Sequence, residues 1–315
     1  MSEILPAILF LLIGFVLLIK GADFFVEGSS SVAKLLRVPS LIIGLTIVAM
    51  GTSLPECAVS ITASMTGNNA LAVSNVVGSN IFNLLVVCGA CALFSPMLIQ
   101  KESLSKEFPF SIGCSVLLLV LGYLGLSLSR GDGLFLVTLF ICYLVYMIFS
   151  ALKARRAASD TEDNIKVLPV WKCIIYIVGG IAAIKFGGDF VVNGASTVAA
   201  SFGLSQNLIG LTIVAVGTSL PELVTSVVAA RKKELAMAVG NILGSNIFNI
   251  LLILGLSASL SPIAFVTENI IDVVLMTAVS LLAWGMGWTK QQIDRREGIV
   301  MLSIYAVYLI YICIR

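Results

Sequence analysis

A duplicated polar motif inside apolar sequence is the feature that most constrains this chain. The letters GLTIVAMGTSLPE run from Gly44 to Glu56, and GLTIVAVGTSLPE run from Gly210 to Glu222. The same offset of 166 residues aligns two copies of GSNIFN, from Gly78 to Asn83 and from Gly244 to Asn249. The chain therefore contains an internal duplication whose polar residues stay in register.

The composition around these motifs requires a membrane. Of 315 residues, 59% are hydrophobic and 11% are charged. Apolar runs of about 20 residues recur, each long enough to cross roughly 30 Å of hydrocarbon. They are continuous rather than alternating, which favours helices over a β-barrel. We expect an all-α integral membrane protein in a lipid bilayer, and a formal charge of +2 gives no reason to expect nucleic acid as a partner.

The apolar runs predict ten transmembrane helices arranged as two inverted five-helix repeats. The predicted spans are residues 4 to 35, 40 to 65, 70 to 95, 108 to 129, 132 to 152, 168 to 200, 206 to 230, 235 to 258, 266 to 288 and 297 to 314. We divide the chain into a first repeat (1–152), a cytoplasmic linker (153–167) and a second repeat (168–315). An odd number of spans inverts the second copy, as in many secondary transporters.

The basic residues predict the orientation. Lys and Arg concentrate in alternate connections, such as the one that holds Arg231, Lys232 and Lys233, whereas the remaining connections hold only Arg130 and the terminal Arg315. By the positive-inside rule the first set is cytoplasmic. We therefore expect a multi-pass protein of the cell membrane with both termini extracytoplasmic.

Glu56 and Glu222 are acids for which the sequence offers no internal partner. A carboxylate at bilayer depth is unfavourable unless it is paired, protonated or bound to a cation. No Lys or Arg occurs between Val38 and Gln100, or between Phe186 and Ala230. The sequence therefore indicates that the compensating cation comes from solution.

Two further acids have a basic residue one helical turn before them. Lys20 precedes Asp23, and Lys185 precedes Asp189, at spacings that place each pair on one helical face. We predict that both form intrahelical pairs. These acids, together with Glu27, are interpreted as packing or gating groups rather than ligands.

The prolines of the duplicated motif expose backbone oxygens beside the two glutamates. Pro55 and Pro221 lack an N–H and clash with the carbonyl four residues back, which belongs to Gly51 or Gly217. Freed carbonyl groups are hard oxygen ligands. We expect a helix break with free carbonyls at each motif.

A polar stripe follows on the next span of each copy, with side chains recurring every four residues. Its members are Asn75, Ser79 and Asn83, and Asn241, Ser245 and Asn249. Asn75 and Asn241 could be ligands or could make helix-packing hydrogen bonds. Carboxylate, amide, hydroxyl and carbonyl oxygens select hard ions such as Ca²⁺ and Na⁺. The chain has no histidine, and its seven cysteines are scattered through apolar spans, so a Cys/His zinc site is excluded.

At these motifs the whole chain resembles the cation/calcium antiporter superfamily, and specifically its sodium/calcium exchanger branch. The resemblance implies a diamond of ion sites at the membrane centre. It implies that the Glu56 and Glu222 carboxylates and the Thr52 and Thr218 carbonyls bind Ca²⁺. The implied sodium ligands are Ser53, Ser79, Asn83, Ser219, Ser245 and the carbonyls of Ala49 and Ala215, with Asn249 beside the central site.

The function implied is Na⁺/Ca²⁺ antiport by alternating access, with spans 4 to 35 and 168 to 200 moving against a core. The implied stoichiometry of about three Na⁺ per Ca²⁺ would make the exchange electrogenic. We expect no catalytic residues and no cofactor, with Ca²⁺ and Na⁺ bound as substrates, and a chain that functions as a monomer.

Several alternatives remain. Potassium-dependent relatives carry Asp at the position of Asn249, and the proton-coupled branch carries a different motif around its first glutamate, so K⁺-dependent Na⁺/Ca²⁺ exchange and H⁺/Ca²⁺ exchange are disfavoured. A calcium channel would use similar oxygens but would gain its pore from a ring of subunits. An intramembrane protease would need a base beside Ser53 or Ser219, and the sequence offers only glutamate there.

Overall fold

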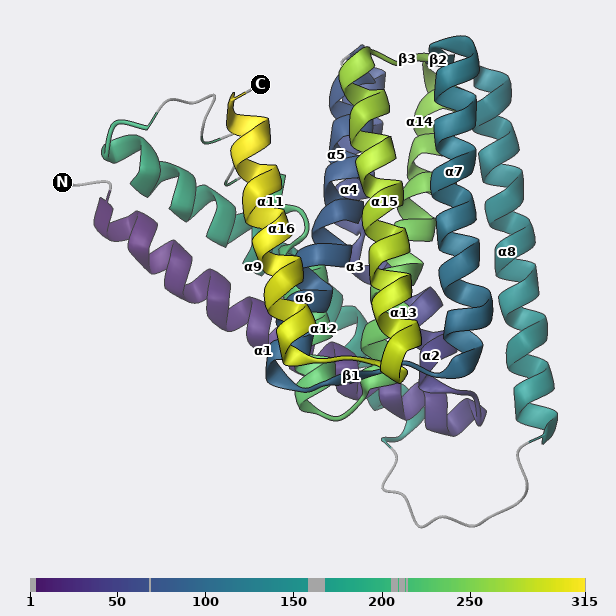
Figure 1. The fold of residues 1–315 in the computed structure, drawn as a ribbon. Coiled ribbons are helices and arrows are strands. Elements are labelled where there is room, and N and C mark those ends of the chain that lie inside the picture. Colours follow the sequence, from purple (N-terminus) through teal and green to yellow (C-terminus); the bar gives the residue numbers. More distant parts are fainter. Residues whose placement is uncertain are drawn as a thin grey trace.

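The computed structural model describes residues 4–67, 69–157, 168–204, 209, 213 and 215–314, and these are predominantly helical (Figure 1). The helices of the first half, with η for π-helical segments, are α1 (Ile4–Leu36), α2 (Ser40–Ile43), η1 (Gly44–Val48), α3 (Ala49–Thr52), α4 (Leu54–Met65), α5 (Asn69–Phe82), η2 (Asn83–Val87), α6 (Cys88–Phe94), η3 (Ser103–Glu107), α7 (Phe108–Gly125) and α8 (Arg130–Ala157). Those of the second half are α9 (Val170–Ser201), α11 (Ala215–Gly217), α12 (Leu220–Arg231), α13 (Leu235–Phe248), η5 (Asn249–Leu254), α14 (Gly255–Leu260), α15 (Thr267–Lys290) and α16 (Arg295–Ile314).

Eight helical stretches among the described residues are long and apolar enough to cross a membrane. A ninth is added if the pair Ser40–Thr52 and Leu54–Met65, which is bent by 50°, forms one span. The prediction of a helical membrane protein is confirmed, but its count of ten spans is not. The predicted span 206 to 230 begins among residues outside the described ones, and α12 within it has only 12 residues, too few to cross roughly 30 Å.

α1 and α9 form a closely packed antiparallel pair that leans away from the other helices in Figure 1. Glycines at heptad spacing on both helices bring the two backbones together, with Gly14 against Gly187 and Gly21 against Gly180. A Cβ atom added at Gly21 would lie 2.9 Å from the Cβ of Ala183, closer than side chains tolerate. Small residues of this kind allow close helix contact inside a membrane. We refer to the two helices as the α1–α9 pair.

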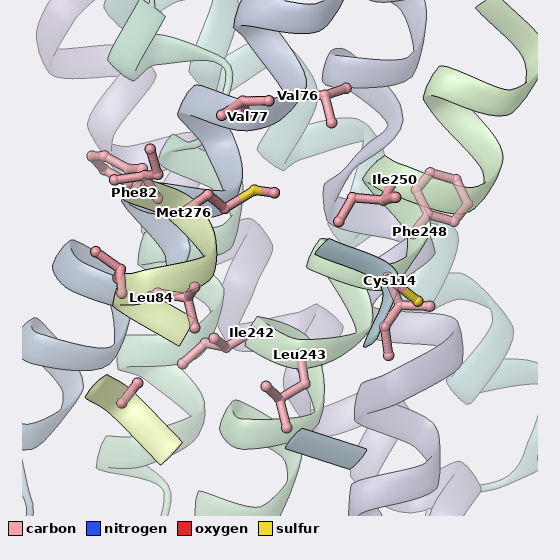
Figure 2. Close-up of a cluster of buried hydrophobic side chains, with 14 of the residues drawn as sticks. Val76, Val77, Phe82, Leu84, Cys114, Ile242, Leu243, Phe248, Ile250 and Met276 are labelled. Atoms are coloured by element: carbon pink, nitrogen blue, oxygen red, sulfur yellow. The ribbon is translucent and has the colours of Figure 1, made fainter. Parts of the chain in front are cut away.

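The remaining helices form a bundle with its own core. Side chains such as Val77, Leu243 and Met276, from α5, α13 and α15, belong to one buried cluster, of which Figure 2 shows a part. A second, smaller cluster includes Phe25 of α1 and Met237 of α13, and it joins the α1–α9 pair to the bundle. The apolar packing therefore distinguishes two bodies in contact.

The last helix of each half packs on the opposite half, with α8 against α14 and α16 against α6. Two antiparallel ladders of two residues each also join the halves. β1 (Met97–Leu98) pairs with β4 (Gln292–Ile293), and β2 (Ser127–Leu128) pairs with β3 (Ile263–Ala264). The prediction of an all-α chain missed these ladders, because a two-residue strand is too short to leave an alternating pattern.

The boundary after the first half also differs from the prediction. α8 continues to Ala157, so Lys153, Arg155 and Arg156 are helical rather than part of a linker that begins at residue 153. A long basic side chain is compatible with a helix end, where it interacts favourably with the helix dipole. The rest of the predicted linker, residues 158 to 167, lies outside the described residues.

Candidate functional site

The first GTSLPE motif forms a helix break. α3 ends at Thr52, α4 begins at Leu54, and Pro55 occupies the first turn of α4. The helical stretch Ser40–Thr52, which ends with α3, is bent by 50° relative to α4. Since Pro55 has no N–H, the carbonyl of Gly51 receives no hydrogen bond from it. The motif therefore interrupts the helix where the sequence predicts a break.

The second motif has the same form. α11 ends at Gly217, α12 begins at Leu220, and Pro221 occupies its first turn. Both motif glycines face the α1–α9 pair. A Cβ atom at Gly51 would lie 2.7 Å from the Phe25 ring, and one at Gly217 would overlap Val192 of α9. The α1–α9 pair therefore lies directly against both helix breaks.

The two glutamates are held by hydroxyl groups of the opposite copy. Ser53 Oγ donates a hydrogen bond to Glu222 Oε1 at 2.7 Å, and Ser219 Oγ donates one to Glu56 Oε1 at 3.2 Å. Both carboxylates are buried. The other oxygen of each, Oε2, has no hydrogen-bond partner among the described residues. Nor does either glutamate form an ion pair within the described part of the chain. Each carboxylate thus keeps one free oxygen.

A second set of reciprocal bonds surrounds the glutamates. Thr52 Oγ1 donates to Asn241 Oδ1 at 3.1 Å, and Asn241 Nδ2 donates to Ser226 Oγ at 2.9 Å. In the other copy the corresponding bonds join Thr218 Oγ1 to Asn75 Oδ1 (3.5 Å) and Asn75 Nδ2 to Ser60 Oγ (3.0 Å). The two asparagines that the sequence left open between ligation and packing therefore join helices through hydrogen bonds.

Four asparagines form a buried layer beside these residues. Asn83 Nδ2 donates to Asn246 Oδ1 at 3.2 Å, and Asn249 Nδ2 donates to Asn80 Oδ1 at 3.0 Å. Asn83 Oδ1 and Asn249 Oδ1 have no partner among the described residues. The amide nitrogens are therefore engaged, while two carbonyl oxygens remain available as acceptors.

Asn80 and Asn246 belong to the same hydrogen-bonded layer, and the sequence alone did not single them out. They position Asn83 and Asn249 across the interface between the copies, and Asn80 Nδ2 also donates to the Asn246 carbonyl at 3.2 Å. The signal was present, because both lie in the duplicated GSNIFN letters. It was missed because they do not fall on the four-residue stripe.

The backbone changes its winding at Asn83 and Asn249. The π-helical segments η2 and η5 begin at these two residues. Short π-helical insertions are frequent at functional sites, because they change the direction of side chains and leave backbone groups less regularly paired. Nothing in the sequence predicted them.

The remaining predicted ligands differ in whether their oxygens already take part in hydrogen bonds. Ser79 Oγ lies 3.0 Å from Ser219 Oγ, and the buried Ser245 Oγ has no partner among the described residues. The Ala49 carbonyl accepts hydrogen bonds from the Ser53 N–H at 3.1 Å and from Thr52 Oγ1 at 3.3 Å, so it is already engaged. Ala215 begins α11.

This arrangement is suited to a hard cation. Its free groups are oxygens: two carboxylate Oε2 atoms, two amide Oδ1 atoms and one hydroxyl. Groups of three or more His, Cys, Asp or Glu that could hold a metal do not occur among the described residues. Two buried carboxylates without a fixed counter-charge require a cation or protons.

Membrane-crossing helices that enclose such a polar centre define a multi-pass membrane protein with an interior suited to cations. The family model described as sodium/calcium exchanger protein matches residues 6–149 and 172–314. The chain belongs to this family, and the resemblance predicted from the two motifs is confirmed. The family consists of exchangers, so the chain falls in a transporter class rather than an enzyme class.

Individual relatives are similar over nearly the whole length. CaxA of Alkalimonas amylolytica is 40% identical, covering 96% of this chain and 98% of CaxA. Sodium/calcium exchanger MaX1 of Methanosarcina acetivorans is 34% identical, covering 96% of this chain and 97% of MaX1. The structure of the sodium-calcium exchanger NCX_Mj soaked with Na⁺ and Ca²⁺ matches with a TM-score of 0.83 and 30% identity, covering 96% of this chain and 97% of that chain.

Proposed function

We propose that this protein is a Na⁺/Ca²⁺ antiporter that binds the two ions alternately at one buried site. The observation that carries the proposal is the pair of glutamates, Glu56 and Glu222, each bonded to a serine of the other copy and each with a free oxygen. MaX1 and NCX_Mj are sodium/calcium exchangers by name, which supports the choice of ions.

Charge balance supports the assignment of ligands. The two carboxylates give the site a charge of about −2, which one Ca²⁺ or two Na⁺ would neutralise. We assign Ca²⁺ to the Glu56 and Glu222 carboxylates and the Thr52 and Thr218 carbonyls. The proposed sodium ligands are Ser53, Ser79, Asn83, Ser219, Ser245 and the carbonyls of Ala49 and Ala215, with Asn249 beside the centre. The side-chain oxygens of Asn83, Ser245 and Asn249, which have no partner among the described residues, are consistent with this set. The Ala49 carbonyl would have to exchange its bond from Thr52 Oγ1 for Na⁺.

The exchange is electrogenic in this proposal. With about three Na⁺ per Ca²⁺, the sodium-loaded site carries one net charge, because Asn83 and Asn249 supply no third carboxylate. Each 100 mV of membrane potential then biases a cycle by roughly 2.3 kcal/mol. In proteoliposomes, an imposed valinomycin potential should change the Na⁺-dependent Ca²⁺ flux, and its sign should set the direction. A flux that ignores the potential would indicate two Na⁺ per Ca²⁺ instead.

The moving parts are the α1–α9 pair and the bundle, arranged as two inverted repeats. The pair has its own close packing and lies against both helix breaks, at Gly51 and Gly217. A shift of the pair could therefore open one side of the site while closing the other. We place the protein in the cell membrane as a monomer, with both termini outside and without a cofactor.

Counterflow tests the antiport directly. Proteoliposomes loaded with Na⁺ and diluted into Na⁺-free buffer should take up ⁴⁵Ca²⁺, and vesicles loaded with choline should not. The control is the Glu222→Gln variant at equal protein incorporation. Uptake that persists without Na⁺ would indicate a channel, and uptake driven by a proton gradient alone would indicate H⁺/Ca²⁺ exchange. A requirement for K⁺ beside Na⁺ would indicate the potassium-dependent alternative.

A further inference from the structure

A cavity between α7 and α8 lies apart from the cation site. Its volume is about 560 Å³, and it is lined mainly by apolar side chains of these two helices, with Leu251 of η5 at its inner wall. α7 and α8 lie at the edge of the bundle in Figure 1, and both carry large exposed apolar residues, such as Val120 and Ile141. Since both helices are long and apolar enough to span the membrane, this face meets lipid hydrocarbon.

Two buried polar atoms in this cavity have no hydrogen-bond partner among the described residues. They are Glu107 Oε2 and Tyr143 Oη. Tyr143 is only 6% exposed, and its ring stacks on Phe110 with centroids 5.2 Å apart and planes at 9°. Buried polar groups are almost always satisfied, because leaving one unpaired is unfavourable. A ligand that fills the cavity should therefore carry hydrogen-bond donors as well as apolar surface.

The charged residues at the cavity narrow the chemistry of that ligand. Lys106 and Glu107 are adjacent in the chain and both line the cavity, so it presents one cation and one carboxylate together. A head group with a phosphate and an ammonium has the complementary pair of charges. A primary ammonium also has N–H donors for the carboxylate and the tyrosine hydroxyl, whereas a quaternary ammonium has none.

We propose that this cavity is a binding site for a phospholipid with a primary-amine head group. An acyl chain of the lipid lies along the apolar side chains of the cavity. The ammonium donates hydrogen bonds to Glu107 and Tyr143, and the phosphate pairs with Lys106. Leu251 lies two residues beyond Asn249 in η5, so the bound lipid contacts the π-helical segment that begins at the cation site. The proposal does not depend on which ions the protein exchanges.

Lipid retention tests the proposal. The purified protein is mixed with equal amounts of phosphatidylethanolamine, its mono- and dimethyl derivatives and phosphatidylcholine, all with the same acyl chains, and bound lipid is counted by native mass spectrometry. Retention should fall once fewer than two N–H donors remain, and the ethanolamine lipid should exceed the choline lipid at least roughly tenfold, since the choline head group loses the hydrogen bonds to both Glu107 and Tyr143. Equal retention of all four lipids would overturn the proposal.

Variants separate the head-group contacts from simple filling of the cavity. Glu107→Gln and Tyr143→Phe should each reduce the preference for ethanolamine, whereas Lys106→Gln should lower retention of all four lipids alike. Tyr308→Phe is the matched control, because Tyr308 is a buried tyrosine as far from the start of α16 as Tyr143 is from the start of α8, and it does not line the cavity. An undiminished preference in both Glu107→Gln and Tyr143→Phe, with unchanged melting temperatures, would contradict the assignment.

Discussion

α1 and α9 are related by the same offset as the two motifs, yet they are tied to the bundle differently. Lys232, in the turn between α12 and α13, pairs with Asp23 of α1 at 2.7 Å and with Glu27 at 3.5 Å. Ser30 of α1 also donates a hydrogen bond to Glu234 in the same turn. The sequence predicted Lys20 as the partner of Asp23, and the structure instead brings Lys232 to it from the other half. α1 is thus fastened to the bundle by charged groups.

Among the described residues, α9 forms no ion pair with the bundle that corresponds to the one from Lys232. Asp189 pairs with Lys185 of its own helix at 2.7 Å, as the i, i+4 spacing predicted. The position equivalent to Lys232 is Thr66, whose hydroxyl bonds to the Thr62 carbonyl one turn earlier in its own helix. The interior is more symmetric: the Ser53–Glu222 bond matches the Ser219–Glu56 bond, and the Thr52–Asn241 bond matches the Thr218–Asn75 bond. The exception is the Ser219–Ser79 bond, because the equivalent Ser245 Oγ has no partner among the described residues. The duplication therefore preserves most bonds of the candidate cation site, whereas the described ion pairs of α1 and α9 differ.

The largest effect should come from the two glutamates, and it should be equal in the two copies. Glu56→Gln or Glu222→Gln leaves a divalent ion with one anionic ligand in a poorly solvated site. Since loss of a supporting group around a metal already lowers affinity by about 10- to 100-fold, ⁴⁵Ca²⁺ transport should fall at least as far. Near-parental transport in either variant, with normal folding and insertion, would refute the assignment of that glutamate.

The serines that hold the glutamates should come next. Ser53→Ala removes the hydrogen bond to Glu222, and Ser219→Ala removes the one to Glu56. A hydrogen bond to a charged group contributes about 1.5–3 kcal/mol, so Ca²⁺ affinity measured by calorimetry should fall at least roughly tenfold in each. Thr66→Ala serves as a control outside the centre. A large loss in one serine variant and none in the other would break the equivalence of the copies.

The two asparagines that position Asn83 and Asn249, namely Asn80 and Asn246, should contribute mainly to stability. Asn80→Ala leaves the Asn249 amide donor without its acceptor, and Asn246→Ala does the same to the Asn83 amide donor. Leaving a buried donor unsatisfied costs about 1–3 kcal/mol, so both variants should melt at lower temperature by similar amounts. Unchanged melting of both variants, measured in the same detergent, would show that these bonds are dispensable.

The smallest effect should come from the ion pairs that differ between α1 and α9. Lys232→Gln removes both ion pairs to α1, whereas Lys185→Gln removes only a pair within α9. Partly exposed pairs contribute about 0.2–1 kcal/mol each, so hydrogen exchange of the α1 amides near Asp23 should accelerate by a few-fold in Lys232→Gln. Lys185→Gln should leave the attachment of α9 unchanged. Equal acceleration of hydrogen exchange in α1 and α9 would show that the two helices are attached to the bundle alike.

Much of the candidate site could be predicted from the sequence, because the features that define it depend on residues close together in the chain. A proline predicts a break four residues after the carbonyl that it frees, and an acid with no basic residue nearby predicts a need for an external cation. Lys185 and Asp189 were paired correctly for the same reason. The exact duplication of the motifs also predicted that both copies would contribute alike.

Other features depend on contacts between distant parts of the chain. Lys232 reaches Asp23 across more than half of the sequence, and Asn80 meets Asn249 only when the two copies face each other. The π-helical segments that begin at Asn83 and Asn249 had no signal in the sequence. These features need the folded bundle, whereas Glu56 and Glu222 could be selected from the letters alone.

Ion competition at the shared centre is the most direct test of a single Na⁺/Ca²⁺ site. Calorimetric titration of the purified protein with Ca²⁺ in Na⁺-free buffer should show one Ca²⁺ per chain, abolished equally by Glu56→Gln and by Glu222→Gln. Added Na⁺ should weaken Ca²⁺ binding competitively, so that high Ca²⁺ restores full occupancy. Ca²⁺ binding that Na⁺ leaves unchanged, or that survives removal of either carboxylate, would contradict exchange through one site built from both copies.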